Sequence, residues 1–577
     1  MIRVDQIKCV PAQVTMPDGS MNEALLVQKA AAVLRIAPSE IKALFIRRRS
    51  IDARKKPQIF YIFSVDVVLP EGQEEQVLKR NRNAAFRKSP WVEYVFPVTD
   101  RRPQGMQARP VIIGMGPAGL FCAYELALHG FRPVLIERGK AVEERTKDVA
   151  RFWKEGALEP DSNVQFGEGG AGAFSDGKLN TLIKDRDGRC AEVLRIFCKY
   201  GAKQEICYDH KPHIGTDALV SIVRNMRNAI LEHGGEIHFE TKLSGLKMSD
   251  GKMTGISVVC GGRERVMSCA AVVLAIGHSA RDTIQMLYET DIPMEAKAFA
   301  VGLRVEHPQA LINESQYGSA DTGVLGAAAY KLTAQAKNGR GVYTFCMCPG
   351  GYVVNASSEH DMLAVNGMSY SKRDGENANS AVIVTVEPKD YGDGSPLSGI
   401  AFQRVLERRA YEIGNGSIPV ERYGDYKAEV RGGCGEDRAV QSTERCCGLS
   451  ENSVDQAWEP CIKGNYTYAK VSDILPKELA EAFVEGMEAF GGKIPHYNDD
   501  RALVEGVESR TSSPVRILRN EMLACPAADN LFPCGEGAGY AGGIMSAAMD
   551  GVRVAEAVAE KIGNSKHQTE KNIKTSS

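Results

Sequence analysis

Long hydrophobic runs are absent from this chain of 577 residues. No stretch of about 18 apolar residues occurs, and the opening residues, Met1-Ile2-Arg3-Val4-Asp5-Gln6, do not form an apolar leader. The net charge of −2 gives no global reason to expect a nucleic acid or a membrane as partner. We therefore expect a cytoplasmic protein that does not contact a membrane.

Metal-binding and disulfide spacings are absent too. The 15 cysteines are odd in number and scattered, and they include neither a Cys-x-x-Cys pair nor a Cys/His zinc spacing. The sequence therefore predicts no metal site, and most of these cysteines are expected to be buried, reduced thiols.

The chain does contain a glycine-rich turn between a predicted strand and a predicted helix. An apolar, β-branched run at 111–113 leads into Gly114, Gly116, Pro117, Ala118 and Gly119, and helix-favouring residues follow at 121–128. In a Gly-x-Gly-x-x-Gly turn the first glycine permits the tight bend, the second lets the backbone approach a pyrophosphate and the third lets helix and strand pack closely. The helix N-terminus adds unpaired N–H groups that attract an anion.

An acidic residue supports this interpretation. The next predicted strand, 131–136, ends at Glu137, which lies 23 residues past Gly114. Dinucleotide-binding βαβ units place an acid about 20 residues beyond the first glycine, where it binds ribose hydroxyls. The sequence therefore predicts a dinucleotide site.

Three further glycine-containing segments are candidates for the same site. Five glycines occur between Gly167 and Gly177, which favours close contact between backbone and a flat or anionic group over a regular element. The apolar strand 271–276 breaks at Gly277, at the carboxyl edge of the sheet where ligands bind. A late apolar strand leads into the cluster 535–543, and a helix is expected over 546–562.

These patterns predict an α/β fold with several domains. We expect a small ferredoxin-like α+β unit at 1–100, a Rossmann-like nucleotide domain formed by 106–289 and 501–563, an inserted α+β substrate-side domain at 290–500, and a disordered tail at 564–577. A polar linker at 99–107 separates the first two parts.

The N-terminal unit has a basic stretch. Basic residues outnumber acidic ones by two to one between 41 and 102, with Arg47-Arg48-Arg49 as one cluster. Such a face suits RNA or another anion. A solvated face, or one that docks on the remainder of the chain, is favoured because no aromatic-interleaved RNA-binding signature is present.

Together these motifs resemble FAD flavoproteins of the glutathione-reductase structural type. The residues that carry the likeness are the turn at 116–120, Glu137 and Arg138, the segment 167–179, Ala275-Ile276-Gly277, Gly535-Glu536 and Gly542-Gly543-Ile544. Over nearly its whole length the chain is similar to bacterial FAD-dependent dehydrogenases of unassigned substrate that carry a small N-terminal domain. The motifs of this closer likeness are 211–217, 276–282, 299–307, 345–351 and 506–514.

The resemblance implies a non-covalently bound FAD and a role for each segment. The first turn would hold the pyrophosphate, Glu137 the adenosine ribose, the backbone at Leu243 the adenine, and Gly535-Glu536 the pyrophosphate and ribityl. Other implied contacts are Arg138, Gly169, Gly170, Gly172, Ser175, Asp176, Gly177, Lys178, Leu179, Gly277, His278, Arg281, Gly542, Gly543 and Ile544.

The stretch 343–349 resembles the segment that lines the substrate cavity in geranylgeranyl reductases and aromatic hydroxylases. Cys346 and Cys348 replace the aromatic character found there, so a prenyl substrate is not implied. These cysteines are candidates as acid, nucleophile or redox pair, with simple packing as the alternative. Glu306, His278 and Arg510 are candidates to bind an anion or move a proton.

The expected function is FAD-dependent oxidation or reduction of a small molecule. No second dinucleotide fingerprint occurs, so NAD(P)H as electron donor would bind without one. The alternatives are a flavoprotein that acts on or binds RNA through its basic N-terminal unit and a non-catalytic flavin redox sensor. Neither substrate nor oligomeric state follows from the sequence.

Overall fold

The computed structural model of the chain describes residues 1–80, 86–98, 108–392, 394–432 and 457–574, with side chains as far as residue 563. The predicted linker at 99–107 and the last residues of the predicted tail, 575–577, lie outside the described residues. The protein is a mixed α/β protein with a parallel sheet, as the sequence predicts.

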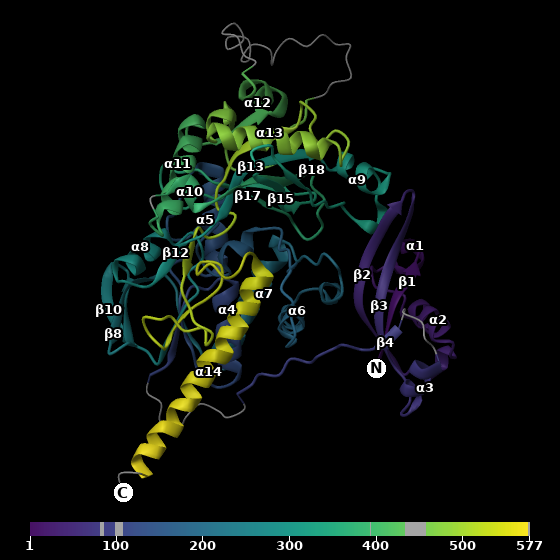
Figure 1. The fold of residues 1–577 in the computed structure, drawn as a ribbon, viewed down its shortest axis with the longest axis horizontal. Coiled ribbons are helices and arrows are strands. Elements are labelled where there is room, and N and C mark those ends of the chain that lie inside the picture. Colours follow the sequence, from purple (N-terminus) through teal and green to yellow (C-terminus); the bar gives the residue numbers. More distant parts are fainter. Residues whose placement is uncertain (81–85, 99–107, 393, 433–456, 575–577) are drawn as a thin grey trace.

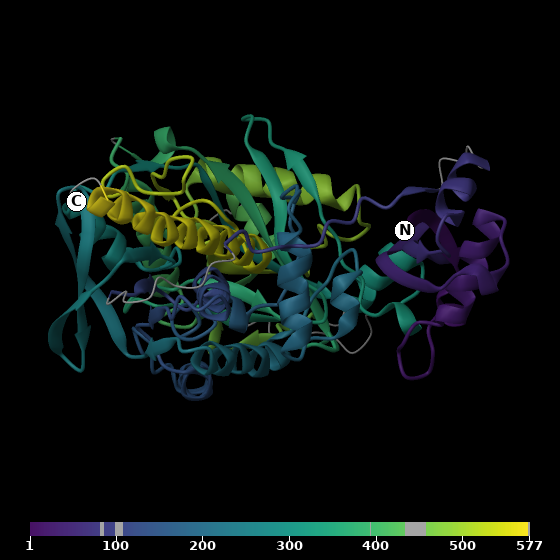
Figure 2. The same cartoon turned by 90° about the horizontal axis from the view of Figure 1, so that it is seen from below.

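The N-terminal unit is a four-stranded antiparallel sheet at one end of the molecule, with strand order β2-β3-β1-β4 (Figures 1 and 2). Its strands are β1 (Ile2–Cys9), β2 (Ala43–Lys55), β3 (Gln58–Val68) and β4 (Phe86–Lys88), and its helices are α1 (Pro11–Val14), α2 (Glu23–Leu34) and α3 (Gln73–Arg80). Alternating apolar residues such as Ile2, Val4, Phe63 and Val65 are buried in its core, as expected for a sheet covered on one face.

Two backbone hydrogen bonds join this unit to the rest of the chain. The amide of Arg49 donates to the carbonyl of Tyr208 at 2.7 Å, and the amide of His210 donates to the carbonyl of Arg49 at 2.9 Å. The Arg49 guanidinium also pairs with Asp209, at 2.6 Å. Part of the basic N-terminal stretch therefore docks on the remainder of the chain.

A five-stranded parallel sheet, β24-β11-β5-β6-β7, organises the middle of the molecule. Its strands are β5 (Pro110–Ile113), β6 (Val134–Ile136), β7 (Glu236–His238), β11 (Ala271–Leu274) and β24 (Leu531–Pro533). β24 pairs with β11 although more than 250 residues separate them. The short apolar strands are buried on both faces, which explains their continuous hydrophobic runs.

Helices cover one face of this sheet. They are α4 (Pro117–Leu128), α6 (Arg189–Lys199), α7 (Thr216–Glu232) and α14 (Ile544–Lys574). The other face packs mainly on residues 243–258, which include the buried Leu243, Ile256 and Val258. Helices α5 (Val142–Glu155) and α8 (Arg281–Glu289) complete this part of the chain. α14 packs along α4, so α4 is buried from Ala118 to Ala127. An antiparallel meander of β8 (Thr241–Ser249), β9 (Lys252–Cys260) and β10 (Arg263–Ser268) lies at the far end from the N-terminal unit (Figure 2).

The sequence predicts a disordered tail from residue 564, and α14 extends into this segment as far as Lys574. The segment 565–574 is rich in Lys, Gln and Glu, which are good helix formers and need no apolar partner to extend an existing helix.

A seven-stranded sheet, β14-β15-β18-β13-β22-β19-β21, forms the second large layer. Its strands are β13 (Phe299–Pro308), β14 (Thr333–Gln335), β15 (Gly341–Cys348), β18 (Asn377–Val386), β19 (Ile418–Arg422), β21 (Tyr466–Tyr468) and β22 (Leu503–Glu508). β22 pairs with β13 and β19 in this sheet, although the sequence predicts that 501–563 belongs to the nucleotide domain. Its apolar residues suit the core of either sheet, so the pattern alone does not choose between them.

Helices α9 (Gln309–Tyr317), α10 (Pro388–Tyr391), α11 (Ser398–Ile413), α12 (Tyr423–Val430) and α13 (Lys477–Gly491) accompany the large sheet (Figure 1). A small sheet of β16 (Tyr352–Asn355), β17 (Val365–Met368) and β20 (Ile462–Lys463) lies beside it. Strands β12 (Met294–Ala296) and β23 (Val515–Ile517) pair where the chain enters and leaves this layer.

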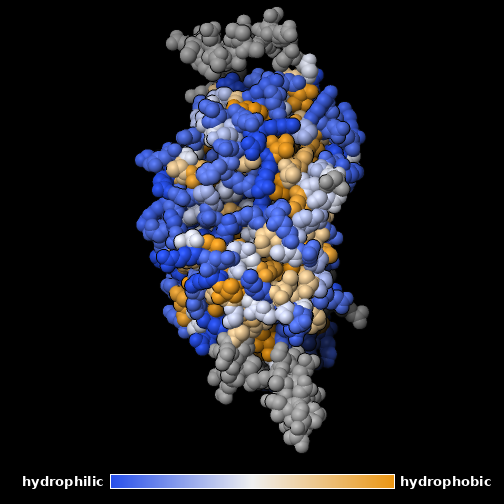
Figure 3. Space-filling view, turned by 90° about the vertical axis from the view of Figure 1, so that its left-hand side faces the viewer, coloured by the Kyte–Doolittle hydropathy of each residue, from blue (hydrophilic) through white to orange (hydrophobic). Residues whose placement is uncertain are grey.

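One face of the molecule is drawn by hydropathy in Figure 3. On the face shown in Figure 3, hydrophilic side chains predominate and hydrophobic ones form patches between them. Within the described ranges, no helix combines the length and the apolar character needed to cross a membrane.

Candidate functional site

The candidate site begins at the carboxyl end of β5. Gly114 has a φ of 95°, and a Cβ there would lie 2.4 Å from the carbonyl oxygen of Ala275. A Cβ at Gly119 would lie 1.9 Å from the carbonyl oxygen of Gly114, so both positions require glycine. At Gly116 an added Cβ would meet only the Cα of Gly170, at 3.8 Å, which leaves open space in front of α4.

The N-terminus of α4 faces this space. The helix starts at Pro117 without a side-chain cap, and Gly116, Pro117 and Ala118 line a cavity. The first amides of a helix have no partner within it and carry a partial positive charge. This end of α4 can therefore bind an anionic group.

The cavity encloses about 1460 Å³ of empty space, part of it open to solvent, and its walls come from both large sheets. It brings together most of the residues predicted from the sequence. These are Gly114, Gly116, Pro117, Ala118, Glu137, Arg138, Gly170, Gly172, Ser175, Asp176, Gly177, Lys178, Leu243, Gly277, His278, Cys346, Arg510, Glu536, Gly543 and Ile544.

The Glu137 carboxylate lies at the carboxyl end of β6. It accepts backbone hydrogen bonds from Met115 at 2.8 Å, Gly139 at 2.9 Å and Gly167 at 3.0 Å. Each carboxylate oxygen has two lone pairs, so the side chain keeps capacity for a further donor. The three backbone amides thus hold the Glu137 carboxylate, a hydrogen-bond acceptor, where the sequence predicts a ribose contact.

The late glycine cluster meets the first one at the end of β24. A Cβ at Gly535 would lie 2.7 Å from the Cβ of Ala118, so the two segments are in contact. Glu536 pairs with Nδ1 of His278 at 3.1 Å. Burial opposes ionisation of Glu536, but His278 outweighs it and lowers the pKa of this carboxyl.

One ring nitrogen of His278 is available for a ligand contact. Its Nε2 is buried, lies in a residue that lines the cavity, and has no hydrogen-bond partner among the described residues. An unpaired buried polar atom is costly, so such an atom in a cavity wall suits a ligand contact.

Asp176 and Lys178 line the cavity on the side of the large sheet. Asp176 accepts hydrogen bonds from Ser369 and from the guanidinium of Arg373. Burial opposes its ionisation, but Lys178 and Arg373 outweigh that effect and lower the pKa of Asp176. The Lys178 ammonium donates to the carbonyl oxygen of Met347.

Cys346 lies at a β-bulge at the end of β15. Phe345 pairs with Ala381 and Cys348 pairs with Asn379, so β15 has one residue more than β18 across this interval. Cys346 has a φ of 46°, which is unusual for a residue other than glycine, and it lines the cavity. Cys348 is fully buried outside the lining.

Glu508 is a cavity residue that the sequence interpretation missed. It ends β22, is 3% exposed, and accepts a hydrogen bond from Nε of Arg304 at 3.0 Å. Burial raises the pKa of Glu508 to about 7, with Arg304 opposing the rise. The available signal was a pair of glutamates, Glu505 and Glu508, in an otherwise apolar strand, which is uncommon unless the charges are paired or functional.

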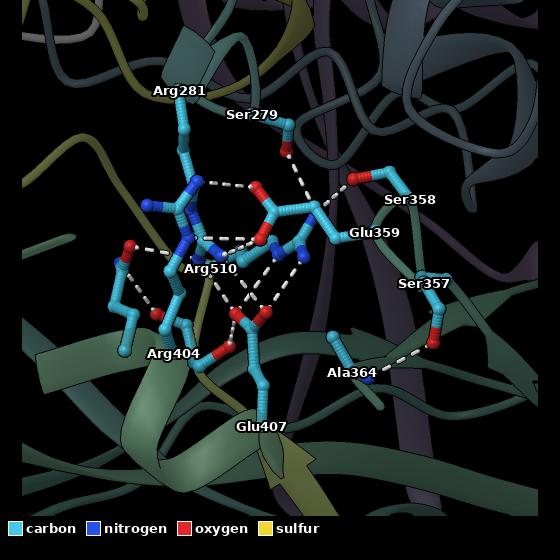
Figure 4. Close-up of polar contacts among 12 residues, drawn as sticks. Ser279, Arg281, Ser357, Ser358, Glu359, Ala364, Arg404, Glu407 and Arg510 are labelled. Carbon is cyan, nitrogen blue, oxygen red and sulfur yellow. Dashed lines mark hydrogen bonds and ion pairs between the residues drawn. The ribbon is translucent and has the colours of Figure 1, made fainter. Parts of the chain in front are cut away.

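Arg510 lines the cavity but is held by a buried carboxylate (Figure 4). Its Nε and one terminal nitrogen donate to Glu407 at 3.0 and 2.7 Å, and the other terminal nitrogen donates to Ser279 and Ser358. Arg281 donates to the opposite side of Glu407, at 2.9 and 2.7 Å. Most donors of Arg510 are therefore engaged within the protein.

Some predicted site residues do not line the cavity. They are Gly119, Gly169, Leu179, Arg281, Gly535, Gly542, Cys348 and Glu306. Several of them support its walls, as Gly119 and Gly535 do through the close contacts described above. Glu306 instead accepts from Asn377 at 2.7 Å and from the amide of Cys461, and burial raises the pKa of both Glu306 and neighbouring Glu505.

The fold and the cavity define an α/β protein with a dinucleotide-type glycine turn, and comparisons with known proteins specify the family. Residues 298–511 match the model of the FAD-dependent protein, C-terminal domain-like family, and residues 1–68 match a domain of unknown function, DUF8436. The chain is 45% identical over 548 residues to an uncharacterized protein of Clostridium beijerinckii, covering 94% of this chain and 97% of that protein. The chain belongs to the same family as this clostridial protein.

Solved structures of low sequence identity match most of the chain with low TM-scores. The flavin-dependent brominase Bmp2 has a TM-score of 0.37 at 12% identity, over 79% of each chain. A geranylgeranyl bacteriochlorophyll reductase-like protein from Thermoplasma acidophilum has 0.36 at 11%, over 81% of this chain and 83% of that one. A flavoprotein/dehydrogenase from Cytophaga hutchinsonii has 0.33 at 12%, over 80% and 79%.

Proposed function

We propose that the protein binds one FAD non-covalently in this cavity and is an FAD-dependent oxidoreductase acting on a small molecule by hydride transfer. The observation that carries the proposal is the meeting of two glycine-rich segments, at 114–119 and 535–543, at the N-terminus of α4. A cofactor with a long middle section needs backbone contacts from both, whereas one turn suffices for a simple nucleotide.

The residues present fit FAD. Gly116 and the first turn of α4 would hold the pyrophosphate, Glu137 would accept from the ribose, and the backbone near Leu243 would contact the adenine. His278 offers an unpaired donor or acceptor for the middle of the cofactor. FAD supplies two-electron redox chemistry once bound.

The substrate side of the cavity would be formed by the large sheet. Cys346, Glu508 and Lys178 line it there, and together they offer a thiol, a carboxyl that titrates near neutrality and a cation. These groups can orient a substrate and move a proton at Oε of Glu508.

The proposal also covers the N-terminal unit, the bounds of the FAD-binding domain and the location of the protein. We take residues 1–100 as a ferredoxin-like unit, because helices connect β1 to β2 and β3 to β4 in a sheet of order β2-β3-β1-β4. The FAD-binding domain would comprise 106–289 and resume after β22, since β22 completes the large sheet. A cytoplasmic location is part of this proposal.

The test is the visible spectrum of the purified protein and of two variants at one position. Gly116→Glu places a carboxylate against the pyrophosphate, and we expect loss of the yellow flavin absorbance. Gly116→Ala adds only an uncharged methyl group, whose nearest protein neighbour lies 3.8 Å away, and should lose less flavin than Gly116→Glu does. Full flavin content in Gly116→Glu would contradict the proposed site.

The electron donor needs a separate experiment. Anaerobic titration of the yellow protein with NADH and with NADPH should bleach the flavin band with one of them, if a nicotinamide is the donor. No bleaching by either, with normal reduction by dithionite, would favour a different donor or a redox sensor.

RNA binding is a weaker second candidate. Arg3 and Arg47 both pair with Asp66, and Arg49 pairs with Asp209, so several of the cations that would form an RNA-binding face are already neutralised. Nucleic acid copurifying with the full chain, and lost on Arg48→Ala, would restore this candidate.

A further inference from the structure

We propose that Cys346 and Cys348 form a redox-active dithiol in the cavity wall, and that the substrate reduced there is a small disulfide. Cys346 would be the attacking thiol and Cys348 the resolving thiol. The inference rests on the proposed FAD-dependent function and assigns a substrate class to the same cavity.

The two thiols have unequal access. Cys346 lines the cavity, whereas Cys348 is fully buried behind it. The Cys348 thiol donates a hydrogen bond to the carbonyl oxygen of Cys346 at 3.2 Å, so the side chain of Cys348 turns back toward its neighbour. An accessible attacking thiol beside a shielded resolving thiol is the arrangement that dithiol exchange requires.

The backbone between the thiols is fixed by two cations. The Arg304 guanidinium donates to the carbonyl oxygen of Cys346 at 3.3 and 3.1 Å, and the Lys178 ammonium donates to that of Met347. The left-handed φ of 46° at Cys346 is strained for a residue with a side chain. Such strain persists where surrounding contacts hold it, commonly at functional sites.

The same surroundings separate the acidities of the thiols. The Cys348 side chain lowers the pKa of the Cys346 thiol against the effect of burial, and Lys178 and Arg304 lower it further. Burial raises the pKa of Cys348. A thiolate at the exposed position and a thiol at the buried one match the roles of attacking and resolving group.

The reaction balances as a two-electron exchange. The Cys346 thiolate attacks one sulfur of the substrate disulfide, breaking its S–S bond and releasing one thiolate. The Cys348 sulfur then attacks Cys346, its proton passes to a departing thiolate, and a Cys346–Cys348 disulfide remains. Two electrons and a proton delivered through the bound flavin restore the dithiol, and a hydride donor of the nicotinamide class replaces those electrons.

A second cysteine pair provides the matched control. Cys198 and Cys207 have sulfurs 3.3 Å apart, but neither residue lines the cavity. If proximity alone determined reactivity toward the cofactor, this pair would behave as Cys346 and Cys348 do.

The first experiment maps the products of 2-hydroxyethyl disulfide with the yellow protein under anaerobic conditions, by peptide mass spectrometry. We expect the segment 341–355 of the wild type to lose two hydrogen atoms. Cys348→Ser should instead retain one mercaptoethanol on Cys346, and Cys346→Ser should give neither product. A wild-type segment that stays reduced, or the same adduct in Cys346→Ser, would overturn the inference.

The second experiment counts electrons and does not depend on turnover. Dithionite titration of the oxidised protein should require twice as many electrons to bleach the flavin in the wild type and in Cys198→Ser as in Cys348→Ser. Equal consumption in wild type and Cys348→Ser would show that no dithiol communicates with the flavin.

The third experiment measures the rate at which iodoacetamide alkylates Cys346 as a function of pH. The alkylation rate should reach half its maximum at a pH below 8.5, the ordinary thiol pKa being about 8.5. Lys178→Met should slow alkylation about tenfold at neutral pH. An ordinary pH profile in the wild type would contradict the assigned attacking thiol. Colourless wild-type protein would refute the proposed function, whereas yellow protein with inert thiols would refute only this inference.

Discussion

Glu508 is a carboxyl group whose environment favours its neutral form near neutral pH. It is buried beside the cavity, and its pKa is raised to about 7 by burial, against an ordinary value of about 4.3. The folded state therefore binds this proton more tightly than the unfolded state does. The contribution to stability is fully present below pH ~4.3 and is lost as the pH rises toward 7.

Glu508→Gln should remove this pH dependence. We expect the free energy of unfolding of the wild type to fall by about 3 kcal/mol, relative to that of the variant, between pH ~4.5 and pH ~8. Urea denaturation across this range measures it. The exposed Glu560→Gln is the control and should track the wild type. A constant difference between wild type and Glu508→Gln at all pH values would contradict the raised pKa.

Glu407 presents the opposite case. It is buried between Arg281 and Arg510 (Figure 4), and although burial opposes ionisation, the two arginines lower its pKa. Glu407→Gln leaves two buried cations without their shared carboxylate, and we expect a loss of about 3 kcal/mol in unfolding free energy at pH 7. Because the folded pKa is lowered, the difference from wild type should shrink as the pH falls below ~4.3.

The exposed Glu412→Gln on the same helix, α11, should cost little and serves as the control. A Glu407→Gln protein as stable as wild type would mean that Arg510 is held mainly by Ser279 and Ser358.

Residues whose backbone makes the site could be predicted from the sequence, and residues whose side chains pair across domains could not. Gly114 and Gly119 could be recognised from their spacing, and the structure shows that only glycine fits at either position. Arg510 was predicted as a site residue and does line the cavity, but its partner Glu407 is about 100 residues away in sequence. Pairing over such a separation leaves no local pattern.

At the scale of elements, α14 and α4 pack closely enough to exclude a methyl group. A Cβ at Gly551 would lie 2.2 Å from the carbonyl oxygen of Ala118 in α4. Gly551→Ala should therefore push the helices apart, lower the unfolding free energy by about 2 kcal/mol and weaken flavin retention, since Ala118 lines the cavity.

Gly563 of the same helix provides the contrast. It is exposed and an added Cβ meets nothing within 4 Å, so Gly563→Ala should stabilise the protein by up to ~1 kcal/mol through helix propensity alone. Thermal unfolding followed by circular dichroism measures both variants. Equal shifts in the same direction would show that the close contact at Gly551 does not constrain the helix pair.

The helices and strands themselves follow the sequence pattern closely, but their membership of a sheet does not. The predicted strand 271–276 and the predicted helix over 121–128 are present as β11 and α4. β22 is an example: its apolar sequence predicts that the strand is buried, but it does not predict that β13 and β19 are its partners. Parallel and mixed sheets are assembled from distant segments, and a local pattern carries no register.

At the scale of the whole molecule, the segment after the N-terminal sheet is part of the central core. Phe96 is 6% exposed and stacks on His129 at a ring separation of 3.9 Å, and the hydroxyl of Tyr94 donates to Glu556 at 3.0 Å. Tyr94 and Phe96 thus pack with the central core and not with the N-terminal sheet.

Two fragments distinguish the role of this segment. A chain that starts at Glu93 should stay yellow and fold, because it keeps Tyr94 and Phe96. A chain that starts at Arg109 should have a lower melting temperature, since it exposes the apolar surface under Phe96. Absorbance at the flavin band and thermal unfolding report both effects. If the two fragments are equally stable, the contacts of Phe96 contribute nothing measurable.

Because the two glycine clusters meet, the cofactor site needs residues that are synthesised at very different times. The first cluster leaves the ribosome early, but Gly535, Glu536 and the start of α14 follow more than 400 residues later. Domains generally fold from the N-terminus as the chain is made, yet here the first half of the site cannot be completed until residues 535–544 have been made. FAD is therefore expected to bind only after these residues have been synthesised, and α14 closes both the apolar core and the cofactor site in one event.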